Sequence, residues 1–217
     1  MTTILCYGDS LTWGTNPDAE GHRHAYADRW PNVLKAGLPS DVEVIAEGMG
    51  GRTTAYDDYT GDCDRNGAKL LPSVLFTHRP VALVILMLGT NDLKPQIAGT
   101  AAAAALGMRR CIEIVRHHAT RLPDPPPKVL LVAPPRVVTT SNPFITEMLA
   151  GAIAQSARFA PLYADEARLA NCAFFDAGTV ATASTLDGIH LDAANTRAIG
   201  QALIPIVQGL LHNPGVA

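Results

Sequence analysis

The sequence of 217 residues has no excess of positive charge, and this absence excludes several classes of partner. Its 17 Lys and Arg side chains face 20 Asp and Glu side chains, so the formal net charge is −3. Without a basic field, the chain has no electrostatic preference for nucleic acid or for an anionic membrane surface. No apolar run approaches the roughly 20 residues that are needed to span a bilayer. We therefore expect neither nucleic acid nor membrane as a partner.

Cysteine is scarce, and its four positions are scattered along the chain at Cys6, Cys63, Cys111 and Cys172. No two of them form a C-x-x-C pair, so their spacing excludes a zinc ribbon. Carboxylates stand singly rather than in clusters with histidines, which argues against a catalytic metal. Because the N-terminal residues lack the basic and apolar regions of a signal peptide, we expect a cytoplasmic protein with free, buried thiols.

Nucleotide-binding motifs are also missing. The glycines at Gly48, Gly50 and Gly51 do not have the G-x-G-x-x-G spacing of a dinucleotide-binding loop, and no G-x-x-x-x-G-K-[ST] sequence occurs. The sequence therefore gives poor support to a nucleotide cofactor.

Short apolar runs alternate along the chain with longer segments of helical periodicity. The apolar runs predict buried strands of a parallel sheet, and they cover Ile4–Tyr7, Val42–Ala46, Val81–Leu88, Val129–Ala133 and Ala173–Phe175. The predicted helices are Trp30–Ala36, Ala68–Thr77, Ala101–Leu122, Phe144–Leu169 and Ala193–Leu211. We expect Pro161 and Pro205 to break or kink the last two helices. The alternation predicts an α/β fold, a three-layer α/β/α sandwich with a central five-stranded parallel sheet, in one domain over residues 1–217.

In such a sheet, ligands bind beyond the carboxyl ends of the strands. Four predicted strand ends carry polar or glycine-rich sequence, and these segments are Gly8–Gly14, Glu47–Thr54, Leu88–Asp92 and Asp187–His190. Their convergence on one edge of the sheet predicts a functional site there.

Ser10 lies between the first strand and the start of a helix, where a serine is often only an N-cap. The same position suits a nucleophile, because a helix N-terminus points backbone N–H groups at an incoming oxyanion and favours its charge. Gly8 permits the tight turn that exposes the hydroxyl. We expect Asp9 to brace this turn by hydrogen bonds rather than to react.

His190 differs from the other six histidines because Asp187 lies one helical turn before it. At that spacing the carboxylate can accept a hydrogen bond from Nδ1, which leaves Nε2 free to take a proton from a serine. D-x-x-H alone is a weak signal, but together with Ser10 it predicts a catalytic triad. The remaining histidines are expected to be structural, and they are His22, His24, His78, His117, His118 and His212.

Two further residues are candidate donors to an oxyanion. Asn91 could be only a turn residue, but its amide is a good donor if it points inward. Gly51 could merely supply a positive φ, or its backbone N–H could be another donor.

These segments, taken in order, resemble the four sequence blocks of the SGNH (GDSL-type) hydrolase family. The blocks are Gly8-Asp9-Ser10-Leu11, the glycine of the second segment, Gly89-Thr90-Asn91-Asp92 and Asp187-x-x-His190. The resemblance implies a flavodoxin-like sheet ordered 2-1-3-4-5 and ester hydrolysis without a cofactor. It makes Ser10 the nucleophile and first oxyanion donor, with Gly51 and Asn91 as the other donors. His190 is then the base, and Asp187 orients it.

Other features are similar to the aryl-esterase and acyltransferase branch of that family. They are Ser10-Leu-Thr-Trp13-Gly14, Gly51-Arg-Thr-Thr54, Leu86-Met-Leu-Gly-Thr-Asn-Asp92 and Phe174-Phe-Asp-Ala-Gly178. This branch implies a serine esterase for short acyl esters, including acetylated sugars and aryl alcohols, with transfer to acceptors other than water in some members. We place Trp13 and Thr90 at the substrate pocket and expect Asp9 and Asp92 to support the turns.

Two non-catalytic alternatives stay open: a flavodoxin-like module that holds a phosphate or flavin at the Ser10 turn, and a carbohydrate-binding protein of the same fold. An intact triad argues against both.

No insertion of the size of an apolar lid interrupts the chain, so nothing in one subunit could enclose a long acyl tail. Irregular stretches follow the first, second and fourth strands, namely Thr15–Arg29, Ala55–Asn66 and Pro134–Pro143. Their position predicts a homo-oligomer in which neighbouring subunits narrow the pocket.

Overall fold

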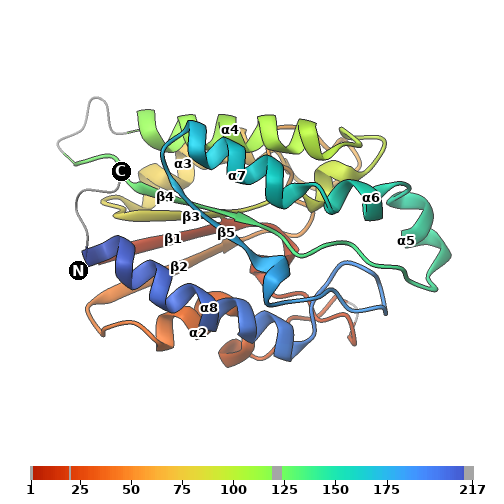
Figure 1. Cartoon of the computed structure of the whole chain (residues 1–217), viewed down its shortest axis with the longest axis horizontal. Coiled ribbons are helices and arrows are strands. Elements are labelled where there is room, and N and C mark those ends of the chain that lie inside the picture. The colour runs from red at the N-terminus through yellow and green to blue at the C-terminus, as the bar shows by residue number, and fades with distance from the viewer. Residues whose placement is uncertain (1, 20, 119–123, 213–217) are drawn as a thin grey trace.

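A computed structural model describes residues 2–19, 21–118 and 124–212, and a parallel sheet runs through its centre (Figure 1). The strands are β1 (Thr2–Gly8), β2 (Val42–Gly48), β3 (Leu83–Met87), β4 (Lys128–Ala133) and β5 (Ala173–Asp176). Their order is β2-β1-β3-β4-β5, and every neighbouring pair is parallel. The predicted fold class and strand order are thus confirmed.

The central strands form because their side chains are apolar on both faces. Leu5 and Tyr7 of β1 point into one core, whereas Ile4 and Cys6 point into the other, and all four are fully buried. The edge strands β2 and β5 are mostly only partly buried, which leaves room in β2 for polar residues such as Glu43. This is the pattern expected when helices cover both sides of a parallel sheet.

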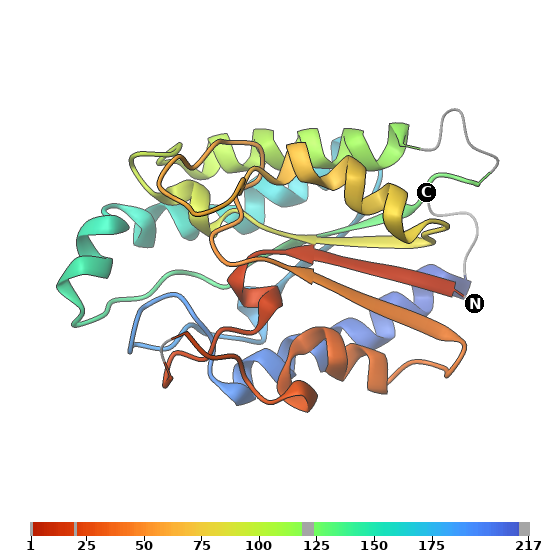
Figure 2. The same cartoon turned by 180° about the vertical axis from the view of Figure 1, so that it is seen from behind.

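Helices form the outer layers of the sandwich (Figures 1 and 2). One face carries α3 (Gly67–His78), α4 (Ala101–His117) and α7 (Phe159–Leu169), and the opposite face carries α2 (Trp30–Ala36) and α8 (Ala193–His212). The short elements are α1 (Ser10–Trp13), α5 (Pro143–Met148), α6 (Ala152–Ser156) and the 3-10 helices η1 (Tyr26–Asp28), η2 (Thr90–Leu93) and η3 (Ala177–Thr179).

The helix predicted over Phe144–Leu169 is three helices, α5, α6 and α7. The first interruption comes at Gly151, whose φ of 82° is incompatible with a continuing α-helix. Pro161 stands in the first turn of α7, where its missing N–H removes no hydrogen bond within the helix. Pro205 does not end α8, because the residues on both sides of it remain helical and pack Leu203 and Val207 into the core. The last predicted residues of the helix after β3, up to Leu122, lie outside the described residues.

In the described ranges, no helix combines the length and the apolar character that a membrane crossing needs. The cytoplasmic location stays a prediction. All four cysteines are free; Cys6 and Cys111 are buried as expected, whereas Cys63 is exposed.

Candidate active site

Three segments that carry polar residues meet at the carboxyl edge of the sheet. Ser10 begins α1 directly after β1, Asn91 lies in η2 after β3, and His190 stands in the loop before α8. Figure 2 shows α1 at the tip of β1, on the side toward which the strands point. The topology therefore brings together residues that are up to 180 positions apart in the sequence.

Asp187, His190 and Ser10 form one hydrogen-bonded chain. His190 Nδ1 lies 2.6 Å from Asp187 Oδ2, and His190 Nε2 lies 2.9 Å from Ser10 Oγ. Because Nδ1 faces a carboxylate, Nδ1 carries the ring proton and donates a hydrogen bond to Asp187. Nε2 is therefore the acceptor for the Ser10 hydroxyl. Both side chains of the His190–Asp187 pair are only one-fifth exposed, which keeps the contact away from bulk water.

The Asp187 carboxylate is also held by backbone groups. Its Oδ1 accepts hydrogen bonds from the N–H groups of Ile189 at 2.9 Å and His190 at 2.8 Å. Burial acts to raise the pKa of Asp187, but the hydrogen bond from the His190 ring and these backbone bonds outweigh it and lower that pKa. Asp187 is therefore kept ionised, as an orienting carboxylate must be.

The turn before α1 is capped by Asp9 and not by Ser10. Asp9 Oδ1 accepts a hydrogen bond from the Leu11 N–H at 2.9 Å, so the Ser10 hydroxyl is left for His190. Burial raises the pKa of Asp9 to about 6, against the hydrogen bond from Leu11 and the charges of His190 and Arg52. Asp9 thus braces the turn without contacting the Ser10 side chain.

A cavity of about 300 Å³ opens beside Ser10 and collects the candidate oxyanion donors. Gly51 and Asn91 line it together with Ser10 and His190. Gly51 has a φ of 80°, a conformation that strains any residue with a Cβ. Asn91 Nδ2 donates hydrogen bonds to the Arg52 carbonyl oxygen at 3.2 Å and to Asp9 Oδ2 at 3.4 Å, and these bonds fix the amide at the edge of the cavity.

Of the two residues expected at the substrate pocket, the structure brings only one to the cavity. Thr90 lines it, whereas Trp13 is not part of its lining. The Trp13 ring lies 4.8 Å from the Arg23 guanidinium, and the Trp13 carbonyl accepts a hydrogen bond from Arg23 Nε at 2.6 Å. The backbone of Trp13 packs on β2, where a Cβ at Gly48 would come 2.2 Å from Trp13 N. The place of Trp13 at the substrate pocket stays a prediction.

Arg52 is a residue that the sequence analysis missed. Its guanidinium is buried 4.1 Å from the centre of the Tyr7 ring, and its Nη1 donates hydrogen bonds to the carbonyls of Gly8, at 2.8 Å, and Glu47. Arg52 therefore ties the ends of β1 and β2 together, and its own carbonyl holds Asn91. The only signal in the sequence is an arginine directly after the Gly50-Gly51 pair.

Asp92, in η2, holds the segment Glu47–Thr54 by hydrogen bonds. It is fully buried and accepts hydrogen bonds from the backbone N–H of Thr54 at 3.1 Å and from the Thr54 hydroxyl. Burial raises the pKa of Asp92 to about 7, and the hydrogen bonds from Thr54 act against that shift. Asp92 thus contacts the supporting loop and not the cavity.

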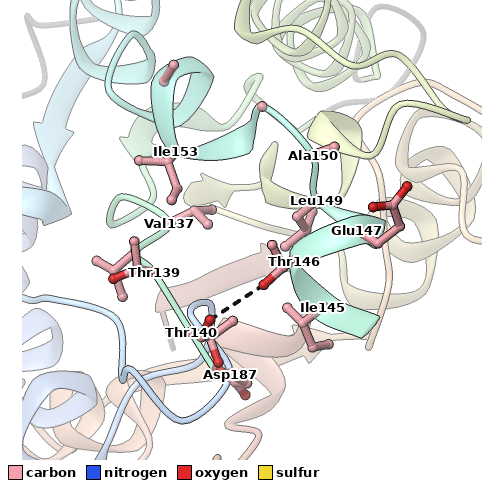
Figure 3. Close-up of a pocket in the computed structure, with 13 residues that line it drawn as sticks. Val137, Thr139, Thr140, Ile145, Thr146, Glu147, Leu149, Ala150, Ile153 and Asp187 are labelled. Carbon is pink, nitrogen blue, oxygen red and sulfur yellow. Dashed lines mark hydrogen bonds between the residues drawn. The ribbon is translucent and has the colours of Figure 1, made fainter. Parts of the chain in front are cut away.

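A second, mainly apolar cavity of about 540 Å³ adjoins the first (Figure 3). It lies between the segment after β4 and the helices α5 and α6, and Asp187 is part of its lining. Ile145 and Leu149 line both cavities and so form part of the wall between them. The Thr146 hydroxyl and the Thr140 carbonyl, 3.5 Å apart, close one side.

The chain is similar to proteins of known family and structure. Residues 6–198 match the GDSL-like lipase/acylhydrolase family. A carbohydrate acetylesterase family member from Sinorhizobium meliloti is 51% identical, over 98% of this chain and 100% of that chain, with a TM-score of 0.95. The aryl esterase of M. smegmatis is 41% identical, over 97% and 100%, with a TM-score of 0.91. Est24, a carbohydrate acetylesterase from Sinorhizobium meliloti, is 36% identical, over 97% and 100%, with a TM-score of 0.92.

No curated protein matches the chain. The family match nevertheless covers residues 6–198, which include all four sequence blocks. The chain therefore belongs to the GDSL-like lipase/acylhydrolase family and is a carboxylic ester hydrolase.

Proposed function

We propose that this protein is a serine esterase that cleaves short-chain acyl esters, such as acetyl esters of sugars or aryl alcohols, through an acyl-serine intermediate. The observation that carries the proposal is the hydrogen-bonded chain from Asp187 through His190 to Ser10, beside a cavity with oxyanion donors. Nucleophile, base and orienting carboxylate in hydrogen-bond reach are the requirements for this chemistry. A module that only binds flavin or carbohydrate needs no such relay.

In the first half of the reaction, His190 Nε2 takes the hydroxyl proton as Ser10 Oγ attacks the ester carbonyl carbon. The tetrahedral oxyanion accepts hydrogen bonds from the backbone N–H groups of Ser10 and Gly51 and from the Asn91 amide. His190 then donates its proton to the leaving alcohol as the carbon–oxygen bond breaks. Throughout, Asp187 stabilises the positively charged imidazolium.

In the second half, a water molecule or another alcohol attacks the acyl-serine. His190 removes the proton of the attacking molecule and returns it to Ser10 Oγ when the acyl group leaves. Water gives the free acid, and an alcohol gives a new ester, so acyl transfer uses the same residues as hydrolysis. The protein supplies the nucleophile, the base and the oxyanion donors, and the attacking water or alcohol comes from solution.

The role of Asn91 gives a separate test. Replacing Asn91 with Ala is expected to lower kcat by about 10²–10³-fold and to change KM much less, because the amide bond strengthens as charge develops on the oxygen. Steady-state kinetics with 4-nitrophenyl acetate measures both constants. Asn32→Ala is the control, because Asn32 bonds to the Tyr26 carbonyl and lies outside the Ser10 cavity. A rise in KM alone would make Asn91 a binding residue for the ground state.

We further propose that the protein is a homo-oligomer whose subunits narrow the site. Large apolar side chains are exposed on or beside the irregular segments at the carboxyl edge of the sheet: Tyr26 (71% exposed), Tyr59 (92%) and Phe144 (72%). Exposed aromatic residues in loops around a cavity are typical of a surface that a second subunit covers. Ile145 and Leu149 bound the Ser10 cavity on its apolar side and separate it from the second cavity.

This proposal predicts a preference for acetyl esters, with kcat/KM falling steeply as the acyl chain lengthens. A series of 4-nitrophenyl esters from acetate to decanoate measures the preference, and light scattering measures the mass of the particle. Activity on none of these esters would contradict the esterase function itself. A monomer, or a preference for chains of lipid length, would contradict the assembly and leave the roles of Ser10 and His190 untouched.

A further inference from the structure

The charged side chains that line the cavity beside Ser10 are all positive. Among the described residues that line it, Lys94 and Arg65 are cationic and none is a carboxylate. Its large side chains are otherwise apolar, namely Ile145, Met148, Leu149 and Ile189. Hydrolysis of a neutral acetyl ester requires neither cation, since the proposed oxyanion donors are two backbone N–H groups and an amide.

Lys94 is the more unusual of the two cations. It follows η2, three residues after Asn91, and the residue is only 9% exposed. No residue in the described part of the chain forms a hydrogen bond or an ion pair with the Lys94 ammonium. Burial lowers the pKa of Lys94, and nearby carboxylates, of which Asp58 has the largest effect, act in the opposite direction.

Most of the Lys94 side chain is buried, but its ammonium keeps contact with solvent. A long side chain that buries its stem and leaves its charged end accessible at a cavity is available to an anionic ligand. Lys94 is therefore suited to pair with an anionic group of a ligand that enters the cavity it lines.

Arg65 forms an ion pair with Asp58, a carboxylate that could otherwise have paired with Lys94. Arg65 Nη1 lies 3.0 Å from Asp58 Oδ2, and Asp58 Oδ1 accepts hydrogen bonds from the backbone N–H and hydroxyl of Thr60. The Arg65 side chain also packs against Gly51, where an added Cβ would lie 2.9 Å from Arg65 Cζ. Arg65 and Asp58 thus form an ion pair beside the Gly51 donor, whereas Lys94 lines the cavity without a direct ion pair to any described residue.

We propose that the ester cleaved at this site carries a carboxylate, and that this carboxylate pairs with the Lys94 ammonium inside the cavity. The inference rests on the proposed esterase function and names its substrate class. The carboxylate can belong to the acyl group, as in a half-ester of a dicarboxylic acid, or to the leaving alcohol. Both present the same anion to Lys94, so the chemistry of recognition is shared.

Two pairs of substrates, each matched in shape and different in charge, test the proposal. The leaving-group pair is 4-acetoxybenzoate and the neutral 4-acetoxybenzamide. The acyl pair is monoethyl succinate and the neutral ethyl succinamate. Wild-type protein should show a higher kcat/KM for the charged member of one pair, and that pair identifies which side of the ester carries the anion. Added salt should reduce this preference, because it screens the attraction.

In Lys94→Gln, the ratio of kcat/KM between the charged and the neutral ester is expected to fall by about 10- to 100-fold, the range for a lost charged hydrogen bond. Lys94→Arg should retain most of the ratio, because it keeps the charge. Lys69→Gln is the matched control, since Lys69 pairs with Asp57 on the surface, outside the cavity, and its loss should leave the ratio unchanged. Thermal unfolding of each variant shows that it is folded.

Several results would overturn the proposal. Wild-type protein with no preference for either charged ester would do so without any variant. An equal loss on the charged and neutral esters in Lys94→Gln would also do so, because it would mean that Lys94 acts on the oxyanion or on the buried carboxylates. The esterase function is judged separately, by hydrolysis of 4-nitrophenyl acetate: activity there without a charge preference removes only the substrate class.

Discussion

Replacing Ser10 with Ala is expected to lower kcat for 4-nitrophenyl acetate by about 10⁴–10⁶-fold, as the loss of a triad member does in other serine hydrolases. The substitution removes the oxygen that lies 2.9 Å from His190 Nε2 and so removes the nucleophile itself. The residual rate above water should come from the oxyanion donors and from binding. A sulfonyl fluoride or an organophosphate should label the wild-type protein once, at Ser10, and should not label the variant.

The loss of activity in Ser10→Ala should come from the missing nucleophile and not from unfolding of the protein. Asp9 caps α1, so the Ser10 hydroxyl is not needed to hold the turn, and the Tm of Ser10→Ala should stay close to that of the wild type. Ser73→Ala, which removes an exposed hydroxyl on α3, is the control for both measurements. Full activity in Ser10→Ala would end the assignment of a serine esterase, and a lower Tm with proportionate loss of folded protein would reduce Ser10 to a structural residue.

The fold could be predicted because its central strands obey a local rule. Residues of β1 and β3 are apolar on both faces, so the sequence alone distinguishes them from half-exposed strands. The error over 144–169 has a physical cause. The three helices α5, α6 and α7 share helical periodicity, and the break between α5 and α6 depends on a positive φ at Gly151, which the sequence alone does not reveal. Pro205 shows the opposite case, where burial of the α8 face offsets a lost hydrogen bond.

The residues of the candidate site likewise fall into those that the sequence predicts and those that it does not. Ser10 and Asn91 could be predicted to lie together because each stands in a short motif directly after a strand, and the topology of the sheet brings strand ends together. Asp187 and His190 share a motif in the loop that leads from β5 to α8. The roles of Arg52 and Lys94 could not be predicted from a local sequence motif. Arg52 donates hydrogen bonds to the carbonyls at the ends of β1 and β2, and Lys94 lines the cavity without an ion pair to any residue that the structure describes. Neither property is local in the sequence. The contact of Trp13 with Arg23 is not local either, because Arg23 comes from a later loop.

His190→Ala is expected to lower kcat by about the same 10⁴–10⁶-fold as the serine variant, because Ser10 Oγ then has no base to receive its proton. Asp187→Asn should keep more activity, with a loss of about 10⁴-fold, since the imidazole remains but its tautomer is no longer fixed. His22→Ala is the control, because His22 is exposed and lies outside the Ser10 cavity.

The double variant Ser10→Ala/His190→Ala decides whether the two residues act as one unit. If His190 works only by moving the proton of Ser10, then removing it from a protein that already lacks the hydroxyl should cost almost nothing further, so the double variant should be as slow as either single variant. Independent contributions would instead multiply, and the double variant would be slower by the product of the two losses. Initial rates of all four proteins with 4-nitrophenyl acetate, at equal concentrations of folded protein, separate these outcomes. A multiplicative loss would mean that the 2.9 Å contact between Ser10 Oγ and His190 Nε2 is not the path of the proton, and that His190 serves the reaction in another way.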